Sequence, residues 1–179
     1  KTYGMDCRSA REPIASLFYK CKYSVSRQQH AVSRNRTLAA LALKYPIPES
    51  APNYGLGHTQ YDAELELPTQ CQSPYVVFLH GTSRDSKLWP TSHWVALAHH
   101  LEQLQLKVLL PWSNPDEKNR AQEIATQTSN VIVLPKLKLT PLAGVLGNAV
   151  LNIGVDTGLM HLSTALNKPS IAIYTDTDP

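Results

Sequence analysis

The sequence predicts an α/β protein whose main part is a doubly wound parallel sheet, preceded by helices. Two observations predict this fold. After Tyr75, five short runs of almost entirely apolar residues alternate with four helical patterns, as in parallel strands covered by helices on both faces. Before these runs, a segment with helical periodicity is separated from the sheet by a stretch rich in Pro and Gly.

The N-terminal segment, residues 10–44, has the spacing of a helix. Ile14, Leu17 and Phe18 recur at i, i+3 and i+4, which places them on one helical face. A looser apolar stripe follows at Ala31, Leu38, Leu41 and Leu43. We therefore expect helices through most of this segment.

The composition of the chain divides it into three parts. Residues 1–45 are expected to form the helical tail of a first domain. Residues 46–70 are rich in Pro and Gly and are interpreted as a linker, with a possible short strand at 61–67. Residues 71–179 are expected to form the sheet domain.

The apolar runs, the helical patterns and the residues at their ends predict the strands and helices of the sheet domain. The expected strands are residues 75–80, 107–110, 131–134, 150–155 and 170–174. The expected helices are about 91–104, 117–126 and 159–166, with a further helix that starts at Thr140 and Pro141. Thr140 and Pro141 resemble a hydroxyl cap followed by Pro at the first helical position. Asn167 is a candidate left-handed cap after the last helix, which Pro169 prevents from continuing.

The composition excludes several classes of protein. The chain is 42% hydrophobic and 17% charged, a balance typical of soluble globular proteins. The sequence has no run of about 18 apolar residues, the length that a membrane-spanning helix needs. The three cysteines form no C-x-x-C pair, which argues against a disulfide framework or zinc site and fits a reducing cytosol. Because the chain begins with Lys1 and ends after an apolar run, we expect a fragment cut at both ends.

Charge is distributed unevenly along the chain. Residues 1–45 carry nine basic and two acidic side chains, whereas the remainder carries eight basic and twelve acidic ones. The basic front part suggests an anionic partner, although a solvated helix face would have the same composition.

Polar residues follow the expected strand 150–155 in an order suited to phosphate. Thr157 and Gly158 open a helix, whose first amides have no internal partners and favour an anion. Gly158 lets a phosphate approach the backbone, and Asp156 would accept hydrogen bonds from hydroxyl groups. His161 lies about one turn into the helix. The same Asp-Thr-Gly could instead be a capped turn; an aspartic-protease motif is rejected because a helix follows it.

A second group of polar residues follows the first expected strand, 75–80. Thr82, Ser83 and Lys87 offer two hydroxyls and a mobile cation, a set suited to a diphosphate. Alternatively, Lys87 could simply pair with Asp85. The acidic pair in residues 176–178 suggests a metal ligand set, but it lacks a third ligand, so no metal is expected.

Five stretches resemble one known family. "YVVFLHGTSRDSKLWPTSHW", "LPWSNPDEKNRA", "VLPKLKL" and "VDTGLMHLSTALNKPSIAIYTDTDP" look like the donor domain of the ADP-heptose glycosyltransferases of family 9. "GMDCRSAREPIASLFY" resembles the segment before that domain. The resemblance implies a GT-B fold with two Rossmann-like domains, of which this chain holds the end of the first, the linker and most of the second.

The resemblance also implies a reaction. Heptose would pass from ADP-L-glycero-D-manno-heptose to the Kdo of Kdo₂-lipid A, with inversion and without metal or cofactor. The basic front part would then face an anionic lipid acceptor. The protein would be a cytoplasmic monomer, peripheral at the inner membrane, with no nucleic-acid partner.

Roles for individual residues are carried over from the resemblance by matching position. Thr82, Ser83 and Lys87 would contact the donor diphosphate, and Lys87 would also stabilise the leaving ADP. Glu117 would bind the ribose, and the backbone of Leu137 would lie at the adenine. Asp156 would hold heptose hydroxyls, Thr157, Gly158 and His161 would complete the donor site, and Arg11 would lie near the acceptor.

The sequence departs from the family pattern in places. Leu137, Ser83 and Thr175 stand where methionine, threonine and glycine are frequent. The family's general base is an aspartate early in the first domain, outside this sequence, so the chain as given is expected to bind donor without turnover. Two other functions stay open. One is a sugar-nucleotide 2-epimerase, although this sequence lacks the usual signature motif of that group. The other is a non-catalytic nucleotide-binding module.

Overall fold

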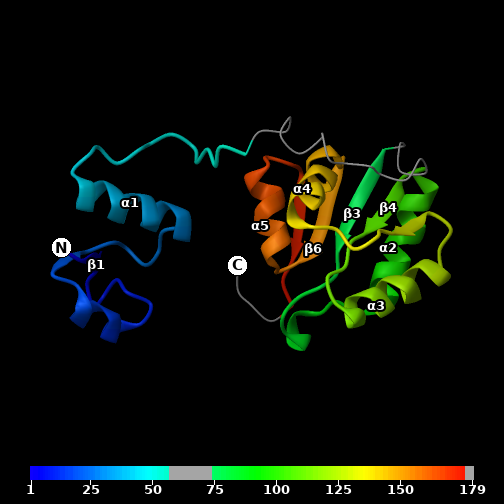
Figure 1. Cartoon of the computed structure of the whole chain (residues 1–179), viewed down its shortest axis with the longest axis horizontal. Coiled ribbons are helices and arrows are strands. Elements are labelled where there is room, and N and C mark those ends of the chain that lie inside the picture. The colour runs from blue at the N-terminus through cyan, green and yellow to red at the C-terminus, as the bar shows by residue number, and fades with distance from the viewer. Residues whose placement is uncertain (57–73, 176–179) are drawn as a thin grey trace. The chain divides into compact units, whose positions relative to one another are not determined.

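The computed structural model describes residues 1–56 and 74–175. The chain divides into two compact units, Lys1–Asn53 and Tyr54–Pro179, which are described separately (Figure 1). The possible strand at 61–67 and the acidic pair in 176–178 lie outside the described residues. Among the described helices, none is long and apolar enough to cross a membrane.

The first unit mixes short strands with helices. Strand β1 (Tyr3–Met5) pairs in parallel with β2 (Cys21–Tyr23), and helix α1 spans Ala31–Leu43. Between the strands, Pro13–Phe18 form a 3₁₀ helix. The prediction of helix through residues 10–44 is therefore wrong between this 3₁₀ helix and α1, because part of that stretch supplies a strand to β1.

The apolar triplet of the 3₁₀ helix is not a buried face. Ile14, Leu17 and Phe18 are 72%, 73% and 76% exposed. Their helical spacing is real, but within this unit no element covers them. Periodicity alone thus predicted a helical turn correctly and its burial wrongly.

The second unit is built on a five-stranded parallel sheet. Its strands are β3 (Tyr75–Leu79), β4 (Lys107–Leu110), β5 (Val131–Val133), β6 (Leu151–Val155) and β7 (Ser170–Ile173), in the order β5-β4-β3-β6-β7. The helices are α2 (Thr91–Gln103), α3 (Pro115–Thr126), α4 (Leu139–Asn148) and α5 (Gly158–Ala165), with a 3₁₀ turn η5 at Asp85–Lys87. The predicted doubly wound parallel sheet is confirmed.

Both faces of the sheet are covered, which explains the continuous apolar runs. Figure 1 shows α2 and α3 on one side of the sheet and α4 and α5 on the other. All five residues of β3 are buried: Val76 and Phe78 join the core under α2 and α3, and Tyr75, Val77 and Leu79 join the core under α4 and α5. Burying each such side chain contributes about 1.5–3 kcal/mol.

Helix ends follow local chemistry, with one correction. Asn167 has φ 57° after α5, and the amide of Lys168 donates to the Ser163 carbonyl at 3.2 Å, so the predicted left-handed cap is confirmed. Thr140 does not cap α4, because the helix begins at Leu139. Pro141 therefore occupies the third helical position, where its missing N–H would have had no partner within the helix.

The strand order brings two exits together. Strands β3 and β6 are neighbours, whereas the chain continues from β3 toward β4 and from β6 toward β7, on opposite sides. In open parallel sheets, ligands bind outside the carboxyl ends of the strands at such a reversal of order. The two exits that the sequence marked as polar, after β3 and β6, lie at this point.

Candidate nucleotide-sugar site

An ion pair joins the two polar exits. The Nζ atom of Lys87, at the end of η5, lies 2.5 Å from Oδ2 of Asp156, at the end of β6. Their side chains are 17% and 21% exposed. The hydroxyl of Thr82 donates to the carbonyl oxygen of Asp156 at 3.2 Å. Lys87 thus pairs across the sheet with Asp156 rather than locally with Asp85.

A third strand exit secures the turn that carries Lys87. The hydroxyl of Thr175, just after β7, donates to the carbonyl oxygen of Ser86 at 3.0 Å. The position where glycine is frequent in the family therefore makes a contact that glycine could not make. Ser83, on the loop before η5, is exposed to solvent.

The first turn of α5 has the features of an anion site. Thr157 precedes the helix in an extended conformation, and its side chain makes no capping hydrogen bond. A Cβ atom added to Gly158 would meet nothing within 4 Å, so packing does not require glycine there. Nε2 of His161 lies 3.9 Å from Oδ1 of Asp156, and the His161 ring is 77% exposed. A protonated His161 would add positive charge to this turn.

A cavity of about 570 Å³ opens beside these groups. Its volume is in the range of small-molecule sites. Four residues that the sequence singled out line it: Glu117, Leu137, Thr157 and Gly158. The remaining walls are mostly apolar and come from the ends of β3 and β4 and from α4 and α5. Such a wall suits a planar base, and the polar residues of the lining include Ser113 and Glu117 at the start of α3 and Thr157 at the start of α5.

Glu117 is held in place by its neighbours at the start of α3. Its Oε2 accepts hydrogen bonds from the amide and hydroxyl of Ser113, at 2.7 and 2.8 Å. Asn114 caps the helix by accepting from the Glu117 amide at 2.9 Å. A Cβ on Gly81 would lie 2.5 Å from Oε1 of Glu117, so the absence of a side chain at Gly81 makes room for the carboxylate.

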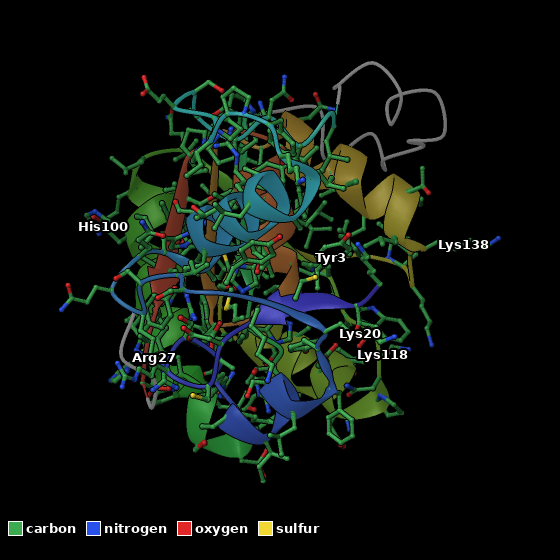
Figure 2. All side chains as sticks on the ribbon, turned by 90° about the vertical axis from the view of Figure 1, so that its left-hand side faces the viewer. Tyr3, Lys20, Arg27, His100, Lys118 and Lys138 are labelled. Carbon is green, nitrogen blue, oxygen red and sulfur yellow. The ribbon has the colours of Figure 1, made fainter. Side chains whose placement is uncertain are left out.

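Trp112 is a cavity residue that the sequence analysis missed. Its indole N–H donates to the Leu134 carbonyl at 2.7 Å, and Nζ of Lys118 and Nζ of Lys136 lie 5.0 and 5.9 Å from its ring centroid. The available signal was its position two residues after the strand 107–110, at the exit of β4. Lys138, two residues beyond Lys136, points away into solvent (Figure 2).

His80 is a second cavity residue without a predicted role. It is 1% exposed, and neither ring nitrogen has a hydrogen-bond partner. Burial lowers the pKa of its imidazole to about 4, and the charge of Arg120 adds to that effect. His80 is therefore neutral at neutral pH.

Arg11 lies in the first unit, Lys1–Asn53, and its surroundings are those of that unit. It is exposed and lines a shallow hollow with Tyr3 and Leu38. Lys20 and Arg27, two more of the basic residues of this unit, are also exposed (Figure 2). Within residues 1–56 and 74–175, no three His, Cys, Asp or Glu side chains gather where they could hold a metal ion.

Comparisons with known proteins identify the family of the chain. The model of glycosyltransferase family 9 (heptosyltransferase) matches residues 1–179. Lipopolysaccharide heptosyltransferase 1 of Escherichia coli K12 is 44% identical over 177 residues, which make up 99% of this chain and 54% of that protein. The protein of the same name from Pseudomonas aeruginosa is 44% identical over 98% of this chain and 48% of its own length.

A solved structure shares the fold. The structure of E. coli heptosyltransferase WaaC with ADP-2-deoxy-2-fluoro heptose matches with a TM-score of 0.86 and 44% identity, over 98% of this chain and 55% of that one. The chain thus spans about half the length of the curated relatives it matches.

Proposed function

The chain belongs to glycosyltransferase family 9, the heptosyltransferases, and from this premise we propose that it supplies the donor site of a lipopolysaccharide heptosyltransferase. The donor would be ADP-L-glycero-D-manno-heptose. The observation that carries this proposal is the convergence of Lys87, Asp156 and the start of α5 beside one largely apolar cavity at the β3–β6 exits. That WaaC has been solved with ADP and with an ADP-heptose analogue supports the same ligand class.

We assign each part of the donor to residues that line the cavity or lie beside it. The adenine would lie along the apolar side, near the backbone of Leu137, and the ribose hydroxyls would meet the Glu117 carboxylate. The diphosphate would lie against the amides at Thr157 and Gly158, with Thr82, Ser83 and Lys87 on its other side. The heptose hydroxyls would donate to Asp156, with His161 beside them.

Electrostatic stabilisation of the leaving group is the chemistry this site offers. A hydroxyl oxygen of the acceptor forms a bond to the anomeric carbon from the face opposite ADP, while the bond from that carbon to the diphosphate breaks. Negative charge grows on the departing phosphate, where the Lys87 ammonium and the amides of α5 would stabilise it. The acceptor proton would pass to a base outside these residues. Attack from the opposite face inverts the anomeric centre.

The acceptor would be Kdo₂-lipid A. Its carboxylates and phosphates are anionic. The first unit carries Arg11, and most of the charged side chains of this unit are basic. A lipid acceptor of this kind would place the enzyme on the cytoplasmic face of the inner membrane, as a peripheral monomer.

Calorimetry and a transfer assay test the proposal. We expect the purified protein to bind ADP and ADP-heptose but not UDP-N-acetylglucosamine, and the full-length protein to transfer heptose to Kdo₂-lipid A. Equal binding of the uridine nucleotide would contradict the donor assignment. An epimerised nucleotide sugar in place of a lipid product would identify an isomerase instead.

A further inference from the structure

Arg11 lies in an irregular segment of the first unit, between the end of β1 and the 3₁₀ helix Pro13–Phe18. Because neither a helix nor a strand holds its backbone, its position depends on hydrogen bonds from other parts of the chain. The proposed function puts Arg11 near an anionic acceptor. Those hydrogen bonds would then decide where its guanidinium meets the acceptor.

Three consecutive carbonyl oxygens of this segment accept hydrogen bonds from two other arginines. The guanidinium of Arg34, in the first turn of α1, donates to the carbonyl oxygen of Ser9. The guanidinium of Arg27 donates to the carbonyl oxygen of Ala10 at 2.9 Å and to that of Arg11 at 3.4 Å. The two side chains therefore tie the segment to α1 and to the stretch that leads into it.

Other contacts hold only the start of the segment. The amide of Ser9 donates to Oδ1 of Asp6 at 2.8 Å, and the hydroxyl of Ser9 accepts from the amide of Val25 at 2.8 Å. The amide of Ala10 donates to the carbonyl oxygen of Asp6 at 2.9 Å. Asp6 and Val25 thus fix the segment as far as the Ala10 amide, and the two guanidiniums hold the carbonyl groups from Ser9 to Arg11.

The two arginines also add positive charge beside Arg11. A guanidinium is always charged in a protein, and hydrogen bonds from a charged donor are roughly twice as strong as neutral ones. Within the part of the chain that the structure describes, no carboxylate forms an ion pair with Arg27 or Arg34. The segment is therefore held by groups that do not repel an anion.

We infer that Arg27 and Arg34 are positioning residues for the acceptor. They hold the backbone from Ser9 to Arg11 so that the Arg11 guanidinium meets the anionic groups of the lipid. Both act through Arg11 and need not touch the acceptor themselves. The inference rests on the proposed function and adds two residues to the acceptor side of the reaction.

A double-mutant cycle in the full-length protein tests whether the two residues act through Arg11. We expect Arg11→Met to raise the KM for Kdo₂-lipid A about tenfold, the value of one hydrogen bond to a charged group. Arg27→Met and Arg34→Met should each raise this KM by about threefold or more, and by no more than Arg11→Met does. The kcat and the KM for ADP-heptose should not change. In the Arg11→Met background neither change should raise the acceptor KM further, because no guanidinium is left to position.

Arg36→Met is the matched control. Arg36 lies on the same helix, and its guanidinium donates to the carbonyl oxygen of Ser50, outside this segment, at 2.7 Å. This variant loses the same charge and should keep the acceptor KM. Arg27 is exposed (Figure 2), so we expect its variant to fold, and its cycle decides the question if thermal unfolding shows that Arg34→Met does not fold.

Two results would overturn the inference. One is an acceptor KM that Arg27→Met leaves unchanged while Arg11→Met raises it. The other is an equal increase with and without Arg11, which would mean that Arg27 acts on the acceptor directly or by its charge. Absence of heptose transfer by the unchanged protein would refute the proposed function instead.

Discussion

The guanidinium of Arg120 donates a hydrogen bond to the carbonyl oxygen of His80 at 3.2 Å, and so joins helix α3 to the end of strand β3. The His80 ring beside this contact is buried and lacks hydrogen-bond partners. Burial and the Arg120 charge lower its pKa from 6.5 to about 4, and the opposing effects of Glu117 and the Pro111 backbone are smaller. The folded protein therefore holds a neutral imidazole at the wall of the cavity.

This buried histidine should make stability depend on pH. Because the pKa is lower in the folded state, the unfolded chain takes up the proton first, and stability falls as the pH drops from about 6.5 towards 4. Between pH 7 and pH 5 we expect a loss of about 2 kcal/mol in the free energy of unfolding from this group. Urea unfolding at both pH values measures it. His80→Gln should lack this part of the loss, and an unchanged pH dependence in the variant would contradict the assignment.

The close pairing of β3 with β6, where Leu79 lies opposite Gly154, predicts a stability defect for Gly154→Ala. The new Cβ would lie 2.5 Å from Cβ of Leu79 and 3.0 Å from its carbonyl oxygen, neither of which is the end of a flexible side chain. Overpacking of this kind typically costs about 1–3 kcal/mol. We expect a lower urea midpoint with an unchanged slope; a midpoint equal to that of the unchanged protein would show that the sheet adjusts freely.

Gly158→Ala should separate binding from folding. An added Cβ meets nothing within 4 Å, and alanine has a higher helix propensity than glycine, an advantage that is small at the first residue of α5. Stability should therefore be kept or slightly raised. The same methyl group would stand where the diphosphate approaches the helix start, so ADP affinity measured by calorimetry should fall. Undiminished ADP binding would place the phosphates elsewhere.

The sheet unit could be predicted because each strand is apolar on both faces. Runs such as residues 75–80 leave little choice other than a strand covered by helices on both sides. The first unit could not be predicted in the same way. The i, i+3, i+4 pattern of Ile14, Leu17 and Phe18 specifies a helical turn, but burial depends on what packs against it, and the pairing of β1 with β2 brings together residues far apart in sequence.

The sequence predicted where the polar groups of the site lie, but it did not predict which of them contact one another. The strand-exit rule placed Lys87 and Asp156 at one edge of the sheet, but it gave no sign that they pair directly. Trp112 and His80 lie within stretches that resemble the family, but no role was carried over to either of them. Their places at the cavity depend on how β3 and β4 lie side by side. The roles of the individual donor-site residues stay predictions that substitution must test.

The leaving-group role of Lys87 predicts a specific kinetic defect. Because charge on the diphosphate grows as its bond to the sugar breaks, the ammonium should stabilise the transition state more than the bound donor. In the full-length protein, Lys87→Ala should lower kcat by about 10²–10³-fold, the usual loss for one preorganised donor, with a smaller change in donor affinity. Steady-state transfer to Kdo₂-lipid A measures both constants, with Lys107→Ala as the control. A higher KM with an unchanged kcat would mean that Lys87 binds ground state and transition state equally, and the role assigned to it would be wrong.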